Sequence, residues 1–163
     1  MNSYYSLNHP ISYDRAQIVK SYCRQAIDET LRLANVAPMA ARYSDEDITI
    51  SNHIIPKKTP IVQAIGVALQ NEKFWPDCDL FDPERFSADS GLNSDSLNCP
   101  FFGFAGKRKC PGYRFVYFEA LAFLSVLLRR YRISLADPEQ TVEPVYGLVT
   151  HPSEEIWLSL TKL

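Results

Sequence analysis

Apolar and polar positions along the first part of the chain follow a helical period. Residues 14–34 contain no proline or glycine, and Pro38 stands a few positions beyond. Apolar side chains recur at roughly helical spacing at Ile18, Tyr22, Ala26 and Leu33. Because such a run buries one face of a helix, we expect a helix over residues 14–34 that ends before the proline.

A two-residue alternation replaces the helical period after this segment. Residues 47–54 alternate apolar and polar side chains, as a half-exposed strand does. The proline-bounded stretch Pro56–Pro60 predicts a turn, and Ile61–Gln63 predicts the returning strand. We therefore expect a β hairpin over residues 47–63, followed by a short helical piece at 64–71.

The middle of the chain shows neither period. Residues 74–99 are rich in proline, aspartate, serine and asparagine. They also carry aromatic side chains at Phe74, Trp75, Phe81 and Phe86. This composition predicts a long ordered loop held by aromatics, and long ordered loops in compact domains are usually functional. A loop that contains a cysteine, residues 101–112, follows directly.

The last third of the chain starts with an apolar run. Tyr113–Arg130 is apolar on nearly every side, which predicts a helix buried in the centre of a fold. The remaining residues, 131–163, predict short strands at Tyr131–Leu135, Val145–Thr150 and Ile156–Leu160. Because no repeat or linker divides the sequence, we expect residues 1–163 to belong to one domain.

The composition indicates a globular, intracellular protein. The 163 residues are 46% hydrophobic, and their net charge of −2 gives no general attraction to nucleic acid. Four cysteines occur without a C-x-x-C pair, a pattern typical of reduced thiols. The longest apolar run, Phe115–Leu128, is interrupted by Glu119 and is shorter than the ~20 residues of a membrane span. We expect no transmembrane segment and no nucleic-acid partner.

One cysteine has unusual surroundings. Pro111 suits the first position of the following helix, which would place Cys110 near the N-cap, where the helix dipole favours a thiolate. The neighbouring Lys107–Lys109 adds three positive charges. Glycines that let a flat group approach, and phenylalanines that cover it, stand nearby at Gly103, Gly106, Gly112, Phe102 and Phe104.

Three reactive uses of such a thiolate compete with a purely structural cysteine. A phosphatase-like nucleophile would need an arginine six residues on, where the chain has Val116. A cysteine–histidine nucleophile would need a nearby histidine, and no local motif supports His9, His53 or His151. An axial ligand to haem iron fits better, because cations can hold the propionates and glycines can lie against the ring. A lone cysteine is most often structural, so the rest of the sequence has to decide.

The segment Gly106–Gly112, GKRKCPG, resembles the haem-binding loop of the haem-thiolate monooxygenases, the cytochrome P-450 family. The family pattern is F-x-x-G-x-R-x-C-x-G. In this chain Gly106, Arg108, Cys110 and Gly112 match the pattern in register.

Further matches follow in the family's order and cover almost the whole chain. Glu29 and Arg32 match the family's E-x-x-R helix, and residues three apart share a helix face. Arg85, within FDPERF, matches the arginine that completes a triad with them. Arg42 and the later IPKKT stretch resemble the family's arginine and hairpin beside a haem propionate.

Three departures from the family pattern are also informative. Gly103 stands where the family has phenylalanine, with Phe104 directly after it. Lys58 replaces the usual hairpin glycine, and Gln70 stands near a frequent histidine. This combination is similar to the vertebrate orphan subfamily numbered twenty.

The resemblance implies a mainly α fold with small β sheets (α+β), of which this chain is the C-terminal, proximal haem-side portion. It implies haem b as the cofactor, with Cys110 as the axial thiolate ligand of the iron. The cofactor-binding residues that it implies are Arg108, Arg42, Phe104, Gly106 and Gly112. The structural triad that it implies is Glu29, Arg32 and Arg85.

The implied function is that of a monooxygenase, which inserts one oxygen atom of dioxygen into a small lipophilic substrate. A flavoprotein reductase would supply the electrons, and the full-length relative would lie at the endoplasmic-reticulum membrane. No catalytic residue is identified, because the family's oxygen-activating segment has no counterpart in the 163 residues. The alternative is a truncated, non-catalytic chain that binds haem or another protein.

Overall fold

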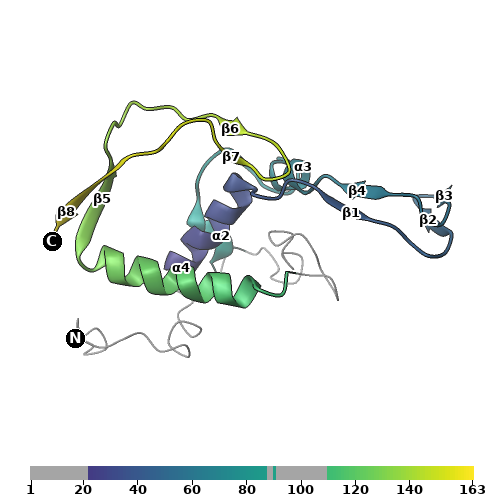
Figure 1. Cartoon of the computed structure of the whole chain (residues 1–163), viewed down its shortest axis with the longest axis horizontal. Coiled ribbons are helices and arrows are strands. Elements are labelled where there is room, and N and C mark those ends of the chain that lie inside the picture. The colour runs from purple at the N-terminus through teal and green to yellow at the C-terminus, as the bar shows by residue number, and fades with distance from the viewer. Residues whose placement is uncertain (1–21, 88–89, 91–109) are drawn as a thin grey trace.

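The computed structural model describes residues 22–87, 90 and 110–163 of the chain. The described part combines helices with small antiparallel sheets of two strands each, joined by long connections (Figure 1). Its helices are α2 (Tyr22–Ala34), α3 (Ile65–Leu69), α4 (Tyr113–Leu128) and the short 3-10 helix η1 (Pro83–Phe86). None of these helices is long and apolar enough to cross a membrane.

Helix α2 ends at a residue that leaves the helical conformation. Asn35 is buried and has a φ of 41°, in the left-handed region that asparagine tolerates better than most residues. Its carbonyl oxygen accepts a hydrogen bond from Thr150 Oγ1 at 3.0 Å, and Thr150 N donates to Val36 O at 2.9 Å. The C-terminal part of the chain is therefore fastened to the end of α2. The first eight residues of the helix expected over 14–34 lie outside the described residues.

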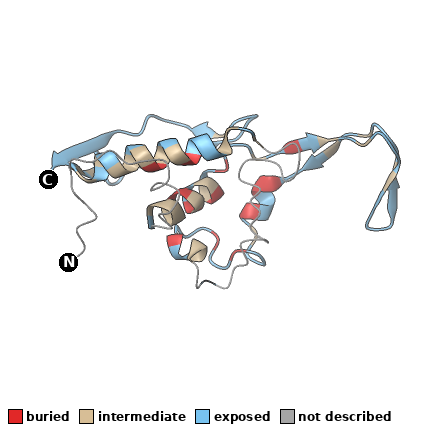
Figure 2. Cartoon of the chain, turned by 90° about the horizontal axis from the view of Figure 1, so that it is seen from below, coloured by how far each residue is buried: buried red, intermediate tan, exposed pale blue. Residues whose placement is uncertain are grey.

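A narrow β ribbon projects from the body of the protein (Figures 1 and 2). Near the body, β1 (Ala40–Arg42) pairs with β4 (Ile61–Gln63). Farther out, β2 (Ile48–Ile50) pairs with β3 (His53–Ile55), and both pairs are antiparallel. The ribbon is one long excursion of the chain that leaves the body and returns to it.

The prediction of one continuous strand over residues 47–54 is wrong, because the chain turns back in the middle of this segment. Ser51 and Asn52 connect β2 to β3, with φ values of 47° and 66°. Two left-handed residues in a two-residue loop give the backbone twist that suits a hairpin. As a consequence β4, the strand expected to return from Pro56–Pro60, pairs with β1 instead of with residues 47–54.

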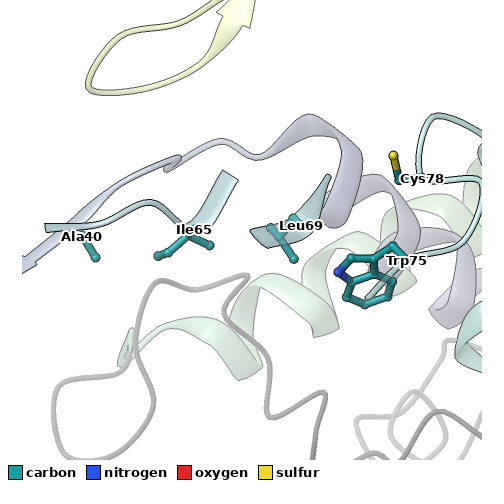
Figure 3. Close-up of a cluster of buried hydrophobic side chains, with 5 residues drawn as sticks. All are labelled: Ala40, Ile65, Leu69, Trp75 and Cys78. Carbon is teal, nitrogen blue, oxygen red and sulfur yellow. The ribbon is translucent and has the colours of Figure 1, made fainter. Parts of the chain in front are cut away.

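A small core lies where the ribbon meets the body (Figure 3). Its buried side chains are Ala40, Ile65, Leu69, Trp75 and Cys78, with Phe86 packed against them. The rings of Trp75 and Phe86 lie 5.9 Å apart between centroids, within the range of favourable aromatic pairs. This core joins β1 and α3 to the loop that was expected to be held by aromatics.

Helix α4 packs on α2 through a second core. Its buried residues are Ile27 of α2 together with Tyr117 and Leu121 of α4. The expectation of a helix buried throughout residues 113–130 is wrong for this chain. Phe115 and Phe123 are 66% and 64% exposed, because the described residues that pack on α4 cover only part of its circumference (Figure 2).

The C-terminal residues form two further antiparallel pairs. Strand β5 (Tyr131–Leu135) pairs with β8 (Leu158–Lys162), and β6 (Pro144–Val145) pairs with β7 (His151–Pro152). The continuous strand expected over 145–150 is wrong, since most of that segment is the loop between β6 and β7. The last strand begins two residues later than the expected 156–160, because the register opposite β5 places Leu158 across from Leu135.

Candidate functional site

A buried pair of opposite charges lies at the centre of the site. Arg32 Nε donates a hydrogen bond to Glu29 Oε2 at 2.7 Å, and Arg32 Nη2 donates to Glu29 Oε1 at 2.9 Å. Both side chains are 0% exposed. Residues three apart on a helix lie on the same face, so α2 alone is enough to bring the two groups together.

The remaining donors of Arg32 bind backbone carbonyl groups of distant segments. Nη1 donates to Leu69 O at 2.9 Å, at the end of α3. Nη2 also donates to Cys78 O at 2.7 Å and more weakly to Leu80 O at 3.3 Å. One guanidinium thus joins α2, α3 and the loop that precedes η1, as the rigid fork of an arginine is suited to do.

Arg85, on η1, completes the group of three charges. Its Nε lies 3.4 Å from Glu29 Oε1, close enough for an ion pair, although this buried nitrogen makes no hydrogen bond. Its Nη2 donates to Asp77 O at 2.6 Å, and its Nη1 donates to Pro76 O. Asp82 N donates to Glu29 Oε1 at 3.0 Å. The structure therefore brings Glu29, Arg32 and Arg85 together around one carboxylate.

Cys110 is a half-buried free thiol just ahead of α4. Helix α4 begins at Tyr113, as expected, with Gly112 as its N-cap. Pro111 lies in the preceding turn and not at the first helical position, so Cys110 stands two residues before the N-cap. Gly112 has a φ of −86° and a ψ of 0°, which continue the turn into the helix. A Cβ added at Gly112 would meet Cys110 Sγ at 4.0 Å, so glycine keeps the space beside the sulfur open.

The residues present fit an iron whose other ligands come from a macrocycle. Within the described ranges, no three histidine, cysteine or carboxylate side chains are grouped as a metal site. Haem requires only an axial ligand from the protein, and a free thiol such as that of Cys110 can supply one. The half-buried thiol and the side-chain-free Gly112 beside it suit a flat ligand.

Of the other residues expected to bind the cofactor, the structure describes some and not others. Arg42 ends β1, is half-buried, and its Nη1 lies 3.4 Å from Ala41 O. Phe104, Gly106 and Arg108 lie outside the described residues.

A polar cluster between α2 and α4 was not expected from the sequence. The Tyr117 hydroxyl donates to Asp28 Oδ1, and Asp28 Oδ2 accepts from Arg24 Nε at 2.9 Å. The guanidinium carbon of Arg24 lies 3.4 Å from the centroid of the Tyr117 ring. The spacing of Arg24 and Asp28, four residues apart on a helix, was a usable signal for their pairing. Nothing local could indicate the tyrosine, which is 89 residues away from Asp28.

Cys78 carries a buried thiol. Burial raises the pKa of this thiol above its usual value, and the charges of Asp79 and Glu72 add to the rise. The sulfur lies 3.8 Å from Asp79 Oδ1. Cys78 therefore stays protonated at neutral pH in the folded chain and acts as a core residue.

Comparison with known proteins identifies the family. The family model described as cytochrome P450 matches residues 8–158. The chain belongs to the cytochrome P450 family. This assignment confirms the resemblance drawn from the cysteine loop and the E-x-x-R helix, and at the level of the family it supports a haem-thiolate monooxygenase.

Relatives place the chain more closely within the cytochrome P450 family. It is 40% identical over 153 residues to cytochrome P450 20A1 of Bos taurus and 37% identical over 153 residues to that of Mus musculus. These alignments cover 94% of this chain and 32% of each relative, so the chain spans about a third of their length. The suspected resemblance to subfamily twenty is confirmed by these identities.

A solved structure supports the fold. The chain resembles a crystal structure of a cytochrome P450 (CYP102L1) with a TM-score of 0.78 and 28% sequence identity. The match covers 92% of this chain and 33% of that one. The expected fold class, mainly α with small β sheets and part of the cytochrome P450 fold, is confirmed.

Proposed function

We propose that this chain supplies the proximal half of a haem-thiolate centre, with Cys110 as the axial ligand. The observation that carries the proposal is the position of Cys110, immediately before the helix that packs on α2. Because α2 also holds the buried Glu29–Arg32 pair, the cysteine precedes a helix that packs on the element carrying the buried charges. The whole protein would then be a cytochrome P450 monooxygenase.

Most of the residues proposed to hold haem b surround the cysteine in sequence, and Arg42 comes from β1. Arg108 and Arg42 would pair with the two propionates, since a guanidinium binds a carboxylate with two parallel hydrogen bonds. Phe104 would cover the sulfur, and Gly106 and Gly112 would let the backbone approach the ring. The group of Glu29, Arg32 and Arg85 would act as the structural triad that keeps the segment before the cysteine loop in shape.

When bound, the haem would supply the activation of dioxygen, and a thiolate ligand favours cleavage of the oxygen–oxygen bond. The residues of this chain would hold the cofactor and present the Cys110 sulfur to the iron. Apolar cover matters because the potential of a haem depends on hydrogen bonds to the ligand and on burial.

The electron donor is proposed to be a flavoprotein reductase, as is general in this family. Lys107 and Lys109 would lie on the side of the haem where an acidic reductase could dock, and charge complementarity would speed the encounter. The substrate is proposed to be small and lipophilic. An endoplasmic-reticulum location is proposed for the full-length relatives.

The test is carbon monoxide binding by the reduced chain after addition of hemin. We expect a Soret band at the red-shifted position of a thiolate-ligated haem, and Cys110→Ser should abolish it. Cys23→Ser is the matched control, because Cys23 is another half-buried free thiol. Circular dichroism of each variant establishes that it is folded.

The alternative function is that of a chain that binds haem or another protein without catalysing a reaction. A second measurement separates the two. Reduction of the haem by a flavoprotein reductase and turnover of dioxygen would support the enzyme. A thiolate band without turnover would favour the haem-binding fragment, and folded protein without the band would contradict ligation by Cys110.

A further inference from the structure

The polar cluster of Tyr117, Asp28 and Arg24 lies inside the contact between α2 and α4. Tyr117 is 5% exposed, and its ring belongs to the apolar core formed with Ile27 and Leu121. Its hydroxyl reaches Asp28, whose side chain is 14% exposed. The cluster is thus a directional contact between two charged residues of α2 and one phenol of α4, at the edge of an otherwise apolar contact.

Apolar packing alone does not fix how α4 is rotated about its axis. All but a few of its 16 residues are apolar, and large apolar side chains occur on exposed and buried sides alike. A helix that is apolar all round can present different faces to a partner at similar free energy. A hydrogen bond to a charged group depends on direction, and buried polar contacts of this kind can specify one arrangement.

The position of the cluster connects this rotation to the cysteine. Tyr117 follows Cys110 by seven residues and lies about one helical turn beyond the start of α4 at Tyr113. On the other side, Asp28 directly precedes Glu29, which binds Arg32 and the backbone of Asp82. Two consecutive carboxylates of α2 therefore hold the two segments that flank the cysteine loop, α4 by Asp28 and η1 by Glu29.

We propose that Tyr117, held by Asp28, is a positioning residue for Cys110. The hydrogen bond sets the rotation of α4 on α2 and, through the start of that helix, the place of the sulfur relative to the haem. Arg24 assists by pairing with Asp28 and by covering the face of the Tyr117 ring. The inference rests on the proposed ligation of haem by Cys110.

The experiment uses the whole chain loaded with hemin, reduced and exposed to carbon monoxide. The quantity measured is the ratio of the thiolate-ligated Soret band to the band of haem without a thiolate ligand. Tyr117→Phe removes one oxygen atom and leaves the ring in the core. Tyr146→Phe removes the same atom from a tyrosine that is 61% exposed, and serves as the matched control.

We expect Tyr117→Phe to lower the ratio by about fivefold or more, since hydrogen bonds to charged groups are among the strongest in proteins. Tyr146→Phe should leave the ratio unchanged. Asp28→Asn keeps an oxygen acceptor for the phenol and should give an intermediate ratio, whereas Asp28→Leu should match Tyr117→Phe. Combining Asp28→Leu with Tyr117→Phe should lower the ratio no further, because both changes remove the same contact.

The thermal unfolding of the haem-free variants separates positioning from general stability. A lower melting temperature with an unchanged band ratio would overturn the proposal, because the tyrosine would then be an ordinary core residue. Equal ratios for Asp28→Asn and Asp28→Leu would also overturn it. If the unsubstituted chain gives no thiolate band, ligation of the haem by Cys110 is contradicted, and the inference about Tyr117 fails with it. If the band is present but the substitutions do not change the ratio, only the inference about Tyr117 is contradicted.

Discussion

The carboxylate of Glu29 and the guanidinium of Arg32 form a doubly hydrogen-bonded ion pair from which solvent is excluded. Removing two charges from water is costly, and their attraction compensates only where the remaining donors and acceptors are also satisfied. Here those partners are the backbone groups at Leu69, Cys78 and Asp82. Losing Glu29 leaves the buried Arg32 without its carboxylate partner, and losing Arg32 leaves Glu29 the longer ion pair with Arg85.

Glu29→Ala is therefore expected to lower the free energy of unfolding by about 3–5 kcal/mol. Urea unfolding followed by circular dichroism measures the change. The control is Asp45→Ala, which breaks an ion pair with Lys58 in which both side chains are mostly exposed. That variant should change the stability by less than about 1 kcal/mol. Similar losses of unfolding free energy in both variants would mean that burial of the Glu29–Arg32 pair does not increase the cost of losing Glu29.

Gly66→Ala is expected to destabilise the chain through a steric contact. A Cβ at this position would lie 2.0 Å from Asn35 Nδ2 and 3.3 Å from Pro38 Cβ. Because Asn35 is buried, the side chain has little room to move, and overpacking of this kind costs about 1–3 kcal/mol. Thermal unfolding provides the measurement. Gly147→Ala is the control, since its Cβ would meet only Val149 O, at an ordinary 3.5 Å.

A second substitution tests whether Asn35 is the obstacle. Asn35→Gly removes the side chain and suits the left-handed backbone, which has a φ of 41°. In that background Gly66→Ala should cost less than it does alone, a non-additive result typical of residues in contact. Strict additivity of the two changes would show that the clash lies elsewhere.

Lys58 occupies a backbone conformation that favours glycine, with a φ of 65°. We expect Lys58→Val to be less stable than Lys58→Gly by about 1–2 kcal/mol, because a left-handed conformation costs a non-glycine residue about this much. Both variants lack the ammonium group that pairs with Asp45, so the ion pair cancels from the comparison. Chemical unfolding of both proteins gives the difference.

The adjacent lysine provides the control for this comparison. Lys57 is not among the described residues with a positive φ. Its backbone N–H donates to Asp47 Oδ1 at 2.8 Å, and both valine and glycine keep this N–H. At this position valine should be at least as stable as glycine. If the difference in stability between the valine and glycine variants is the same at positions 57 and 58, the left-handed backbone of Lys58 does not explain it.

The stability of the chain is expected to fall at alkaline pH through Cys78. The raised pKa means that the folded chain holds the thiol proton more tightly than the unfolded chain does. The resulting stabilisation is complete below the ordinary thiol pKa of about 8.5 and is lost as the pH rises through the folded-state pKa. Urea unfolding as a function of pH should therefore show a steeper decline for the unsubstituted chain than for Cys78→Ala. Parallel curves would contradict the raised pKa.

Local features of the site could be predicted from the sequence, because their partners lie on one helix. Glu29 and Arg32 are three residues apart, so helix geometry alone predicts their contact. The carbonyl groups that bind Arg32 could not be predicted, since any backbone carbonyl can accept and only the tertiary fold selects Leu69, Cys78 and Leu80.

The ribbon shows where periodicity was insufficient. Alternation of apolar residues continues through Ile48–Ile50 toward the turn, so it gave no sign of where β2 ends. The adjacent pair Ile54–Ile55 breaks the alternation, and Asn52 is a residue that favours left-handed turns. Together these two features were a usable signal for the hairpin.

The acceptors of Arg32 also determine when its charge can be buried. They lie 37 to 48 residues farther along the chain than the arginine itself. During synthesis Arg32 therefore leaves the ribosome well before the carbonyl groups that it will bind. Until those groups are in place, the charge of Arg32 stays hydrated. Closing loops of this length is an entropic cost that precedes the gain. The burial of the ion pair at the centre of the site is thus completed only when the segment up to Leu80 has returned to α2.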